Sequence, residues 1–360
     1  MMERCRLRET GLTVGNLPTG PLNSLTDVAG VRVGHTTLIS GSGAWIPGQG
    51  PVRTGVTVIL PHGGNLFTEK SPAAVATLNG FGKPLGFEQV RELGWLESPI
   101  ALTNTLNVGR VADALVTDFL EKNPQGVSVN VVVGETNDSD LNDIQGRHVQ
   151  AEHVRAALQQ ASTDLVPEGC VGAGTGTVCF GWKGGIGSAS RVIPASLGGY
   201  TVGALVQTNF GASEDLIVCG IPVGRQLQPS KSITRAQEKG SIMVVLATDA
   251  PLLSRALERL ALRAAAGIAR TGGVYGHSSG DFVIAFSTAN RLLVKPGELT
   301  QTLQVLRMEG AVMNALFHAA AESVEEAILN SLFMAVDLDG RDGHIRRALP
   351  LDTLLKLIQP

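Results

Sequence analysis

The chain has 360 residues, of which 43% are hydrophobic, so it can bury a large core. Its formal net charge of −3 provides no basic surface of the kind that nucleic-acid binding requires, and we expect no nucleic-acid partner. The 44 glycines, against 10 Phe, 3 Trp and 2 Tyr, indicate tight turns and close backbone approaches rather than a core of large rings.

The start of the chain is charged where a secretory signal would be apolar, and no later segment reaches ~18 uncharged apolar residues. We therefore expect a cytoplasmic protein that does not insert into a membrane. The four cysteines show no C-x-x-C spacing, which disfavours a zinc knuckle and a redox pair, and we expect them to be reduced.

Apolar and β-branched runs predict a series of strands. In chain order, these runs cover residues 23–39, 54–61, 126–138, 199–211, 240–251 and 281–290. The first is a strand or a hairpin that is entered through a turn at Thr26 and Asp27. Three of the later runs end in polar clusters that contain Asn or Asp, so the strand ends present polar groups.

Helical spacing of apolar residues predicts longer helices at residues 141–161, 248–268 and 307–335. Thr248 and Asp249 are candidate N-caps of the second helix. The mixed order of strands and helices favours helices layered on sheets, an α/β or α+β sandwich, over strict βαβ alternation. No repeat, low-complexity block or charge run divides the chain, so we expect a single domain.

Two features suggest a cofactor or a metal. The glycine-rich run at residues 169–178 resembles a dinucleotide-binding loop, but more glycines follow where that motif needs a helix. A tight loop that borders a site is the better interpretation. His148 and His153 share a predicted helix, but their spacing of five turns them apart, whereas metal ligands on one face need three or four. We expect neither a metal nor a cofactor.

Acidic residues occur in two suggestive patterns. Glu135 and Asn137 follow an apolar run, where they either shape a loop through Asx-turn hydrogen bonds or place a carboxylate on a pocket wall for a substrate ammonium group. Ser323 and Glu326 fit the Ser-x-x-Glu pattern of a capping box, which predicts that Ser323 caps a helix. The capping box leaves Glu325 unexplained.

Ser278 and Ser279 directly precede the strand predicted at 281–290. A serine is a poor nucleophile until a base removes its proton, and the chain has no G-x-S-x-G signature. If the chain is cut before Ser279, the freed α-amino group, with an ordinary pKa of about 7.7–8, lies beside its own hydroxyl and can act as that base. The alternative is a plain Ser-Gly-Asp turn.

Motifs that carry a family resemblance span positions 23 to 332. In chain order they are NSLTDVAGVRVGHTTL, GETND with LNDIQGRHV, VQTNFG, ATDAPLL, GIARTGG, and SSGDFVIAFSTAN followed by SVEEAILNSL. Together they resemble the self-processing serine peptidases of the L-aminopeptidase/D-amidase-esterase type, of peptidase family S58, which also include β-aminopeptidases.

The resemblance implies an α+β fold, a four-layer αββα sandwich similar to N-terminal-nucleophile hydrolases but with different strand connectivity. It implies a homotetramer. It also implies that the single domain, residues 1–360, is cut at the Ser278–Ser279 bond into pieces 1–278 and 279–360. Ser279 is then the nucleophile.

Further site residues are expected. By resemblance, Ser323 and Glu325 match a serine and a glutamate that hydrogen-bond near the nucleophile and assist proton handling. Glu135 matches an acidic residue associated with the free amine of the substrate, and Asn137 is a substrate-binding candidate beside it. Asn209, at a predicted strand end, is a candidate oxyanion donor.

The expected activity is hydrolysis of an amide or ester bond next to a free N-terminal amine, through an acyl-enzyme on Ser279. Candidate substrates are α-peptides, D-residue amides, β-peptides and polyamides. Asp140 stands where the family often has an aromatic residue, a departure that concerns the substrate pocket. One alternative is an acyltransferase of the ornithine-acetyltransferase kind, which uses a threonine nucleophile; another is a non-catalytic binding protein on the same scaffold.

Overall fold

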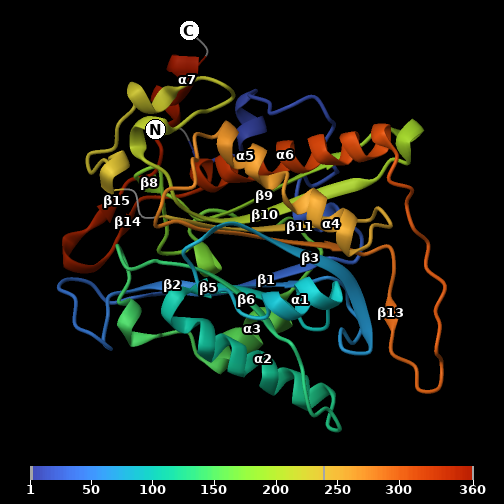
Figure 1. Cartoon of the computed structure of the whole chain (residues 1–360). Coiled ribbons are helices and arrows are strands. Elements are labelled where there is room, and N and C mark those ends of the chain that lie inside the picture. Colours follow the sequence, from blue (N-terminus) through green and yellow to red (C-terminus); the bar gives the residue numbers. More distant parts are fainter. Residues whose placement is uncertain (1–2, 238–239, 359–360) are drawn as a thin grey trace.

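Two stacked β-sheets form the centre of the molecule in the computed structural model, which describes residues 3–237 and 240–358 (Figure 1). The smaller sheet has the order β1 (Arg32–Ser40), β2 (Val52–Leu60), β5 (Ile100–Asn104) and β6 (Val132–Thr136). The larger sheet has the order β13 (Leu292–Leu293), β3 (Glu69–Gly80), β12 (Gly280–Ser287), β11 (Ser241–Thr248), β10 (Thr201–Asn209) and β9 (Ile186–Val192), with β4 (Trp95–Leu96) paired to β3. Two short hairpins pair β7 (Val178–Cys179) with β8 (Trp182–Lys183) and β14 (Leu338–Asp339) with β15 (Ile345–Arg346).

Helices cover the outer faces of both sheets (Figure 1). The smaller sheet packs against α2 (Val108–Lys122) and α3 (Ala151–Gln160), and the larger sheet packs against α4 (Ser254–Ala261) and α6 (Gly310–Phe333), with α5 (Ala264–Arg270) packed on α6. The remaining helices are α1 (Phe87–Leu93), which packs on β3, and α7 (Leu351–Ile358) near the C-terminus. Buried apolar clusters fill the space between each pair of neighbouring layers. The predicted αββα sandwich is therefore confirmed.

The central strands β11 and β12 of the larger sheet are buried on both faces, which explains their largely apolar sequences. Every residue of β11 and β12 is buried. Successive side chains of a strand point to opposite faces. Accordingly, Val244 and Leu246 of β11 pack in the cluster beneath the helices, whereas Met243 and Val245 pack between the two sheets.

Strand register aligns four strand ends in one row across the larger sheet. Asn209 at the end of β10 lies opposite Ser241 at the start of β11, in an antiparallel pair. Ser241 lies opposite Gly280 at the start of β12, in a parallel pair. Gly280 lies opposite Gly80 at the end of β3. Neighbouring strands are ~4.8 Å apart, so this row brings together segments that are distant in sequence.

The predicted strands are found, but two predicted helices are wrong in part. In the segment 141–161 only α3 is an α-helix, and Arg147, with a φ of 47°, has the left-handed backbone that interrupts a right-handed helix. Thr248 ends β11, and Asp249 accepts a hydrogen bond from the Thr201 N–H at 2.8 Å, so neither residue caps a helix. Within the described ranges, no helix combines the length and the apolar character needed to cross a bilayer.

Arg191, in β9, is fully buried and links α6 to the larger sheet. Its Nε donates to Glu322 at 3.1 Å and its Nη2 donates to Glu326 at 2.5 Å, and both carboxylates belong to α6. Its remaining donors reach the carbonyl oxygens of Val14 at 2.8 Å and Ser190 at 2.7 Å. A buried charge is tolerated only when it is paired and hydrogen-bonded, so this cluster fixes where α6 lies on the sheet.

Replacing Arg191 with Met should lower the free energy of unfolding by roughly 3–5 kcal/mol, because Glu322 loses its paired cation and Glu326 keeps only its pair with Arg8. Urea denaturation at neutral pH measures this loss. The control is Arg155→Met, which removes an ion pair with Glu121 whose side chains are 57% and 56% exposed. That change should cost less than ~1 kcal/mol. Equal losses in the two variants would contradict the role of Arg191.

Candidate active site

Ser279 lies immediately before β12 and is 2% exposed. Its hydroxyl donates to Asp281 Oδ1 at 2.7 Å, and its carbonyl oxygen accepts from the Phe81 N–H at 3.3 Å. Between these residues, a Cβ on Gly280 would lie only 2.7 Å from the Phe81 carbonyl oxygen. The Gly-Asp pair after Ser279 thus has a physical reason: glycine permits the close approach, and aspartate accepts the serine hydroxyl.

The turn before Ser279 is held from both sides. The Ser279 N–H donates to the Gly276 carbonyl at 2.8 Å. The side-chain amide of Asn79 donates to the carbonyl oxygens of both Gly276, at 3.0 Å, and Ser279. Tyr275 adopts a φ of 55°, an uncommon left-handed backbone for a bulky residue, and its hydroxyl donates to the Ala265 carbonyl at 2.5 Å. The peptide bond before Ser279 therefore lies in a constrained turn.

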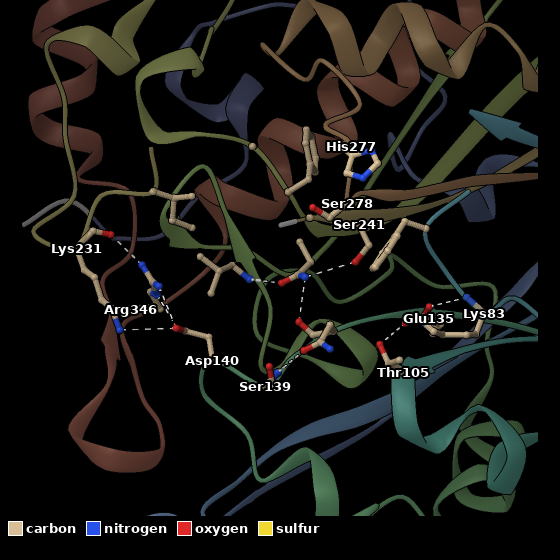
Figure 2. A pocket seen from close by; sticks show the side chains of 18 of the residues that line it. Lys83, Thr105, Glu135, Ser139, Asp140, Lys231, Ser241, His277, Ser278 and Arg346 are labelled. Carbon is tan, nitrogen blue, oxygen red and sulfur yellow. Dashed lines mark hydrogen bonds and ion pairs between the residues drawn. The ribbon is translucent and has the colours of Figure 1, made fainter. Parts of the chain in front are cut away.

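A cavity of about 960 Å³ opens beside this turn (Figure 2). It is lined by Phe81, Lys83, Thr105, Glu135, Asn137, Ser139, Asp140, Val178, Asn209, Phe210, Gly211, Lys231, Ser232, Ile233, Gly240, Ser241, His277, Ser278, Arg341 and Arg346. Ligand pockets usually measure ~300–1,000 Å³, so the cavity has room for a substrate of several residues. The structure thus brings Ser278, Glu135, Asn137 and Asn209 to one cavity, whereas Ser279, the expected nucleophile, is not among the lining residues.

Glu135, in β6, carries a buried carboxylate whose hydrogen-bond donors are neutral. It is 4% exposed. Its Oε1 accepts from the Lys83 backbone N–H at 2.9 Å, and its Oε2 accepts from the Thr105 hydroxyl. No ion pair to this carboxylate occurs within residues 3–237 and 240–358. Buried carboxylates are rare unless paired, so this one is suited to a cationic group of a ligand.

A three-residue segment, Phe81 to Lys83, connects Glu135 to the serine. At one end the Phe81 N–H donates to the Ser279 carbonyl, and at the other the Lys83 N–H donates to Glu135. A Cβ on Gly82 would come within 2.4 Å of the Phe282 ring and 3.3 Å of Glu135 Oε1. The carboxylate and the serine are therefore held in a fixed relation by backbone rather than by flexible side chains.

Asn209 has its amide oriented by two backbone groups. Its Oδ1 accepts from the Val178 N–H at 3.0 Å, and its Nδ2 donates to the Asn137 carbonyl at 3.0 Å. A longer contact of 3.4 Å joins Nδ2 to Ser241 Oγ, which leaves the second amide hydrogen weakly engaged. The Asn137 side chain accepts from the Ser139 N–H at 3.0 Å, the Asx turn of the loop-shaping interpretation.

Lys183 holds the loop that orients Asn209. It is fully buried, and its Nζ donates to the carbonyl oxygens of Gly174 at 3.1 Å, Thr177 at 2.8 Å and Gly184 at 2.7 Å. Burial lowers the pKa of Lys183 from its usual value. Thr177 directly precedes Val178, so the three carbonyls fix the N–H that holds Asn209. The glycine-rich run 169–178 is thus a tight loop that borders the cavity, as predicted.

Ser323 and Glu325 lie away from Ser279. Ser323 is inside α6, so the predicted cap is wrong, and its hydroxyl donates to the Val202 carbonyl at 3.2 Å. Val202 is seven residues along β10 from Asn209, or about 23 Å at ~3.3 Å per residue. Glu325 pairs with Arg270 at 3.3 Å and lines a second cavity of about 580 Å³, and burial raises its pKa. The structure does not support their expected contact with the nucleophile.

Several residues near the site are not predicted by the sequence. Asp281, Asn79 and Ser241 touch the serine turn or the Asn209 amide, and Lys183 acts through a loop. Of these four residues, only Asp281 had a signal in the sequence, because it stands two positions after Ser279. No group of three or more His, Cys, Asp or Glu side chains suited to a metal ion occurs in the described part of the chain.

Comparison with known proteins gives consistent matches over nearly the whole chain. The model of peptidase family S58 matches residues 23–346. β-Peptidyl aminopeptidase BapA of Sphingosinicella microcystinivorans is 43% identical over 358 residues, which cover 96% of this chain and 89% of the relative. A β-aminopeptidase structure from a Burkholderia species has 45% identity and a TM-score of 0.92, with 99% of this chain and 98% of the other covered.

A third similar protein is the L-aminopeptidase D-Ala-esterase/amidase of Ochrobactrum anthropi, described as a prototype for the serine aminopeptidases and as a variant of the Ntn hydrolase fold. Its structure has 37% identity and a TM-score of 0.89, with 98% of each chain covered. This similarity agrees with the αββα layers described above.

Replacing Lys183 with Met should remove a charged donor from three buried carbonyl oxygens, of which those of Gly174 and Thr177 keep another donor, and lower the free energy of unfolding by about 2 kcal/mol. Denaturation curves measure the loss. Lys122→Met is the control, since Lys122 is 55% exposed and pairs only with Asp118 on the same helix. A Lys183→Met protein as stable as this control would show that the carbonyl contacts contribute nothing.

Proposed function

The chain belongs to peptidase family S58, and from this premise we propose that it is an aminopeptidase that hydrolyses amide or ester bonds next to a free amine. The observation that carries the proposal is the fixed pairing of a buried serine with a buried, unpaired carboxylate across the Phe81–Lys83 segment. The names of the relatives, β-peptidyl aminopeptidase and L-aminopeptidase, agree with this activity.

In the proposed maturation, Ser279 cuts the bond that precedes it. Its hydroxyl oxygen attacks the Ser278 carbonyl carbon, and Asp281, which accepts that hydroxyl at 2.7 Å, receives the proton. The carbon–nitrogen bond then breaks as the nitrogen regains a proton, which leaves an ester on Ser279 Oγ. Water hydrolyses the ester to a Ser278 carboxylate and a free Ser279 α-amine. The pieces 1–278 and 279–360 stay packed in one domain.

In the proposed catalytic cycle, the Ser279 α-amine takes the proton from its own hydroxyl. The oxygen attacks the substrate carbonyl and forms an oxyanion, which a hydrogen-bond donor stabilises by ~3 kcal/mol in comparable sites. Collapse releases the leaving amine with that proton and forms an acyl-enzyme. Water then hydrolyses the acyl-enzyme and restores the serine.

The free amine of the substrate is proposed to bind Glu135. A substrate ammonium supplies the positive charge that the two neutral donors of this carboxylate lack. Because backbone hydrogen bonds fix the carboxylate relative to the serine, the ammonium sets which carbonyl reaches Ser279. Both α- and β-amino acyl groups remain compatible with this arrangement, since a cavity of about 960 Å³ has room for either.

Ser279→Ala should abolish both self-cleavage and hydrolysis, with a loss of at least ~10³-fold in kcat/KM. Denaturing electrophoresis with N-terminal sequencing of the smaller band follows cleavage, and alanine p-nitroanilide follows hydrolysis. Ser323→Ala is the control and should keep both, because Ser323 bonds to Val202 at the far end of the sheet. An active, single-band wild-type protein would refute self-cleavage, and a binding protein would release no chromophore.

Glu135→Gln should weaken the binding of free-amine substrates by roughly 1–3 kcal/mol, because the glutamine amide lacks the negative charge that binds the ammonium. Self-cleavage, which involves no free amine before the cut, should persist. Steady-state kinetics on matched amine and N-acetyl substrates test this, with Glu88→Gln, an exposed change, as the control. An equal loss on both substrates would instead indicate that Glu135 only orders its loop.

A further inference from the structure

Asp138 is a buried acid in the segment that forms one wall of the main cavity. Its chain neighbours Asn137, Ser139 and Asp140 line the cavity, and Figure 2 shows Ser139 and Asp140 at its wall. Asp138 itself is not a lining residue and is 1% exposed, so its side chain points into the protein behind the wall. The proposed catalytic cycle does not use this carboxyl group, although burying an acid is costly.

The carboxyl group of Asp138 ties the wall to the smaller sheet. Its Oδ1 accepts from the Asn142 side-chain amide at 3.0 Å, and Asn142 Oδ1 accepts from the backbone N–H of Arg53, in β2, at 2.8 Å. The Asp138 carbonyl oxygen accepts from the N–H groups of Leu141 at 3.2 Å and Asn142 at 3.1 Å. The segment 138–142 is therefore a closed turn that the carboxyl group anchors to β2.

Asp138 also lies between the two backbone groups that orient the Asn209 amide. On one side is the Asn137 carbonyl, directly before Asp138 in the chain, which accepts from Asn209 Nδ2. On the other side is the glycine-rich loop, where a Cβ on Gly176 would lie 3.0 Å from the Asp138 Cβ. This loop leads to the Val178 N–H, which donates to Asn209 Oδ1. A shift of Asp138 therefore disturbs both groups that hold Asn209.

The surroundings of the Asp138 carboxyl group favour its neutral form. Burial raises its pKa to about 7, although the polar side chains of Thr54, Asn142 and Asn104 lower it. Removing an acid from water disfavours its charged form, and these neutral neighbours compensate only part of that cost. Near neutral pH the group therefore exists in part as a carboxylic acid.

The charged side chains on the elements around Asp138 have other partners. Lys183 donates to three carbonyl oxygens, although Asp138 raises its pKa electrostatically against the larger effect of burial. The Arg53 guanidinium donates to backbone carbonyl oxygens, and Asp140 and Asp143 accept from other side chains. An uncharged residue of the same shape, asparagine, can therefore take the place of Asp138.

We infer that Asp138 is a positioning residue, whose carboxyl group holds the turn behind the wall and thereby fixes the Asn209 amide at the cavity. The inference rests on the proposed function and adds a residue to it. It concerns only the wall of the cavity, so it does not depend on which group attacks the substrate. Asn209 is the candidate oxyanion donor, and a displacement of about 1 Å at a reacting site costs on the order of 10²-fold in rate.

The experiment measures kcat/KM per mole of folded enzyme on alanine p-nitroanilide. Asp138→Ala should lower it by about 10- to 100-fold, because the turn loses its anchor and Asn209 its orientation. Asp138→Asn should stay within about threefold of the wild type, since its amide oxygen accepts the same hydrogen bond from Asn142. Asp113→Ala, an exposed change on α2, is the control and should equal the wild type.

A double-mutant cycle separates positioning from plain stabilisation. Because Asp138 acts through Asn209, Asp138→Ala should cause no further loss in an Asn209→Ala enzyme. Additive losses, full activity of either alanine variant, or an Asp138→Asn enzyme as weak as Asp138→Ala would overturn the inference, while hydrolysis by the wild type still upholds the aminopeptidase. If the wild type hydrolyses no substrate, the proposed function fails and this inference fails with it.

The protonation state of Asp138 has its own measurement. Its pKa of about 7 in the folded protein lies above the ordinary 3.8, so between these values the folded protein holds a proton that the unfolded chain has released. The free energy of unfolding should therefore fall as the pH rises from 5 to 8, and fall less in Asp138→Asn. Urea denaturation measures both slopes. Equal slopes would overturn the neutral form of Asp138, on which the asparagine replacement depends.

Discussion

The parallel pairing of β11 with β12 places Ser241 beside the turn that carries Ser279 at the candidate site. Because these strands run in the same direction, their starts, at Ser241 and Gly280, lie side by side. The neighbours of this pair, β10 and β3, are antiparallel to it and therefore end at the same edge. A parallel pair needs a long crossover, and here α4 and α5 supply it before the chain returns through the turn at Tyr275.

The sequence predicted the parts of the fold whose signals are local. Unbroken β-branched runs identified β11 and β12, because both strands are buried on two faces. It missed β3, a twelve-residue strand with Pro72 and several alanines, since its strand state depends on pairing with β12 rather than on propensity. It extended a helix through Arg147, whose left-handed backbone is fixed by contacts that periodicity does not encode.

The residues of the candidate site also differ in whether the sequence contains a local signal for them. Ser279 and Glu135 could be singled out as candidates from the sequence, because each stands in a short polar motif next to an apolar run. Lys183 and Lys231 could not, because Lys183 binds carbonyl oxygens brought to it by a folded loop and Lys231 faces Asp140, which is 91 positions earlier in the chain. Ser323 shows the opposite error: a local pattern suggested a cap, but the helix continues through it because both its flanks are buried.

The central position of β12 in the larger sheet affects how a chain cut before Ser279 could fold and unfold. β12 lies between β3 and β11, and α6 comes after it in the chain, so the segment that begins at Ser279 supplies the middle of one sheet and part of an outer layer. Neither of the two pieces, residues 1–278 and 279–360, has a complete hydrophobic core on its own. If the chain is cut there, as proposed, folding is expected to precede the cut, because each piece contributes strands or helices that the other needs. The unfolding of the cut molecule would be one-way, since two separate chains would have to find each other again.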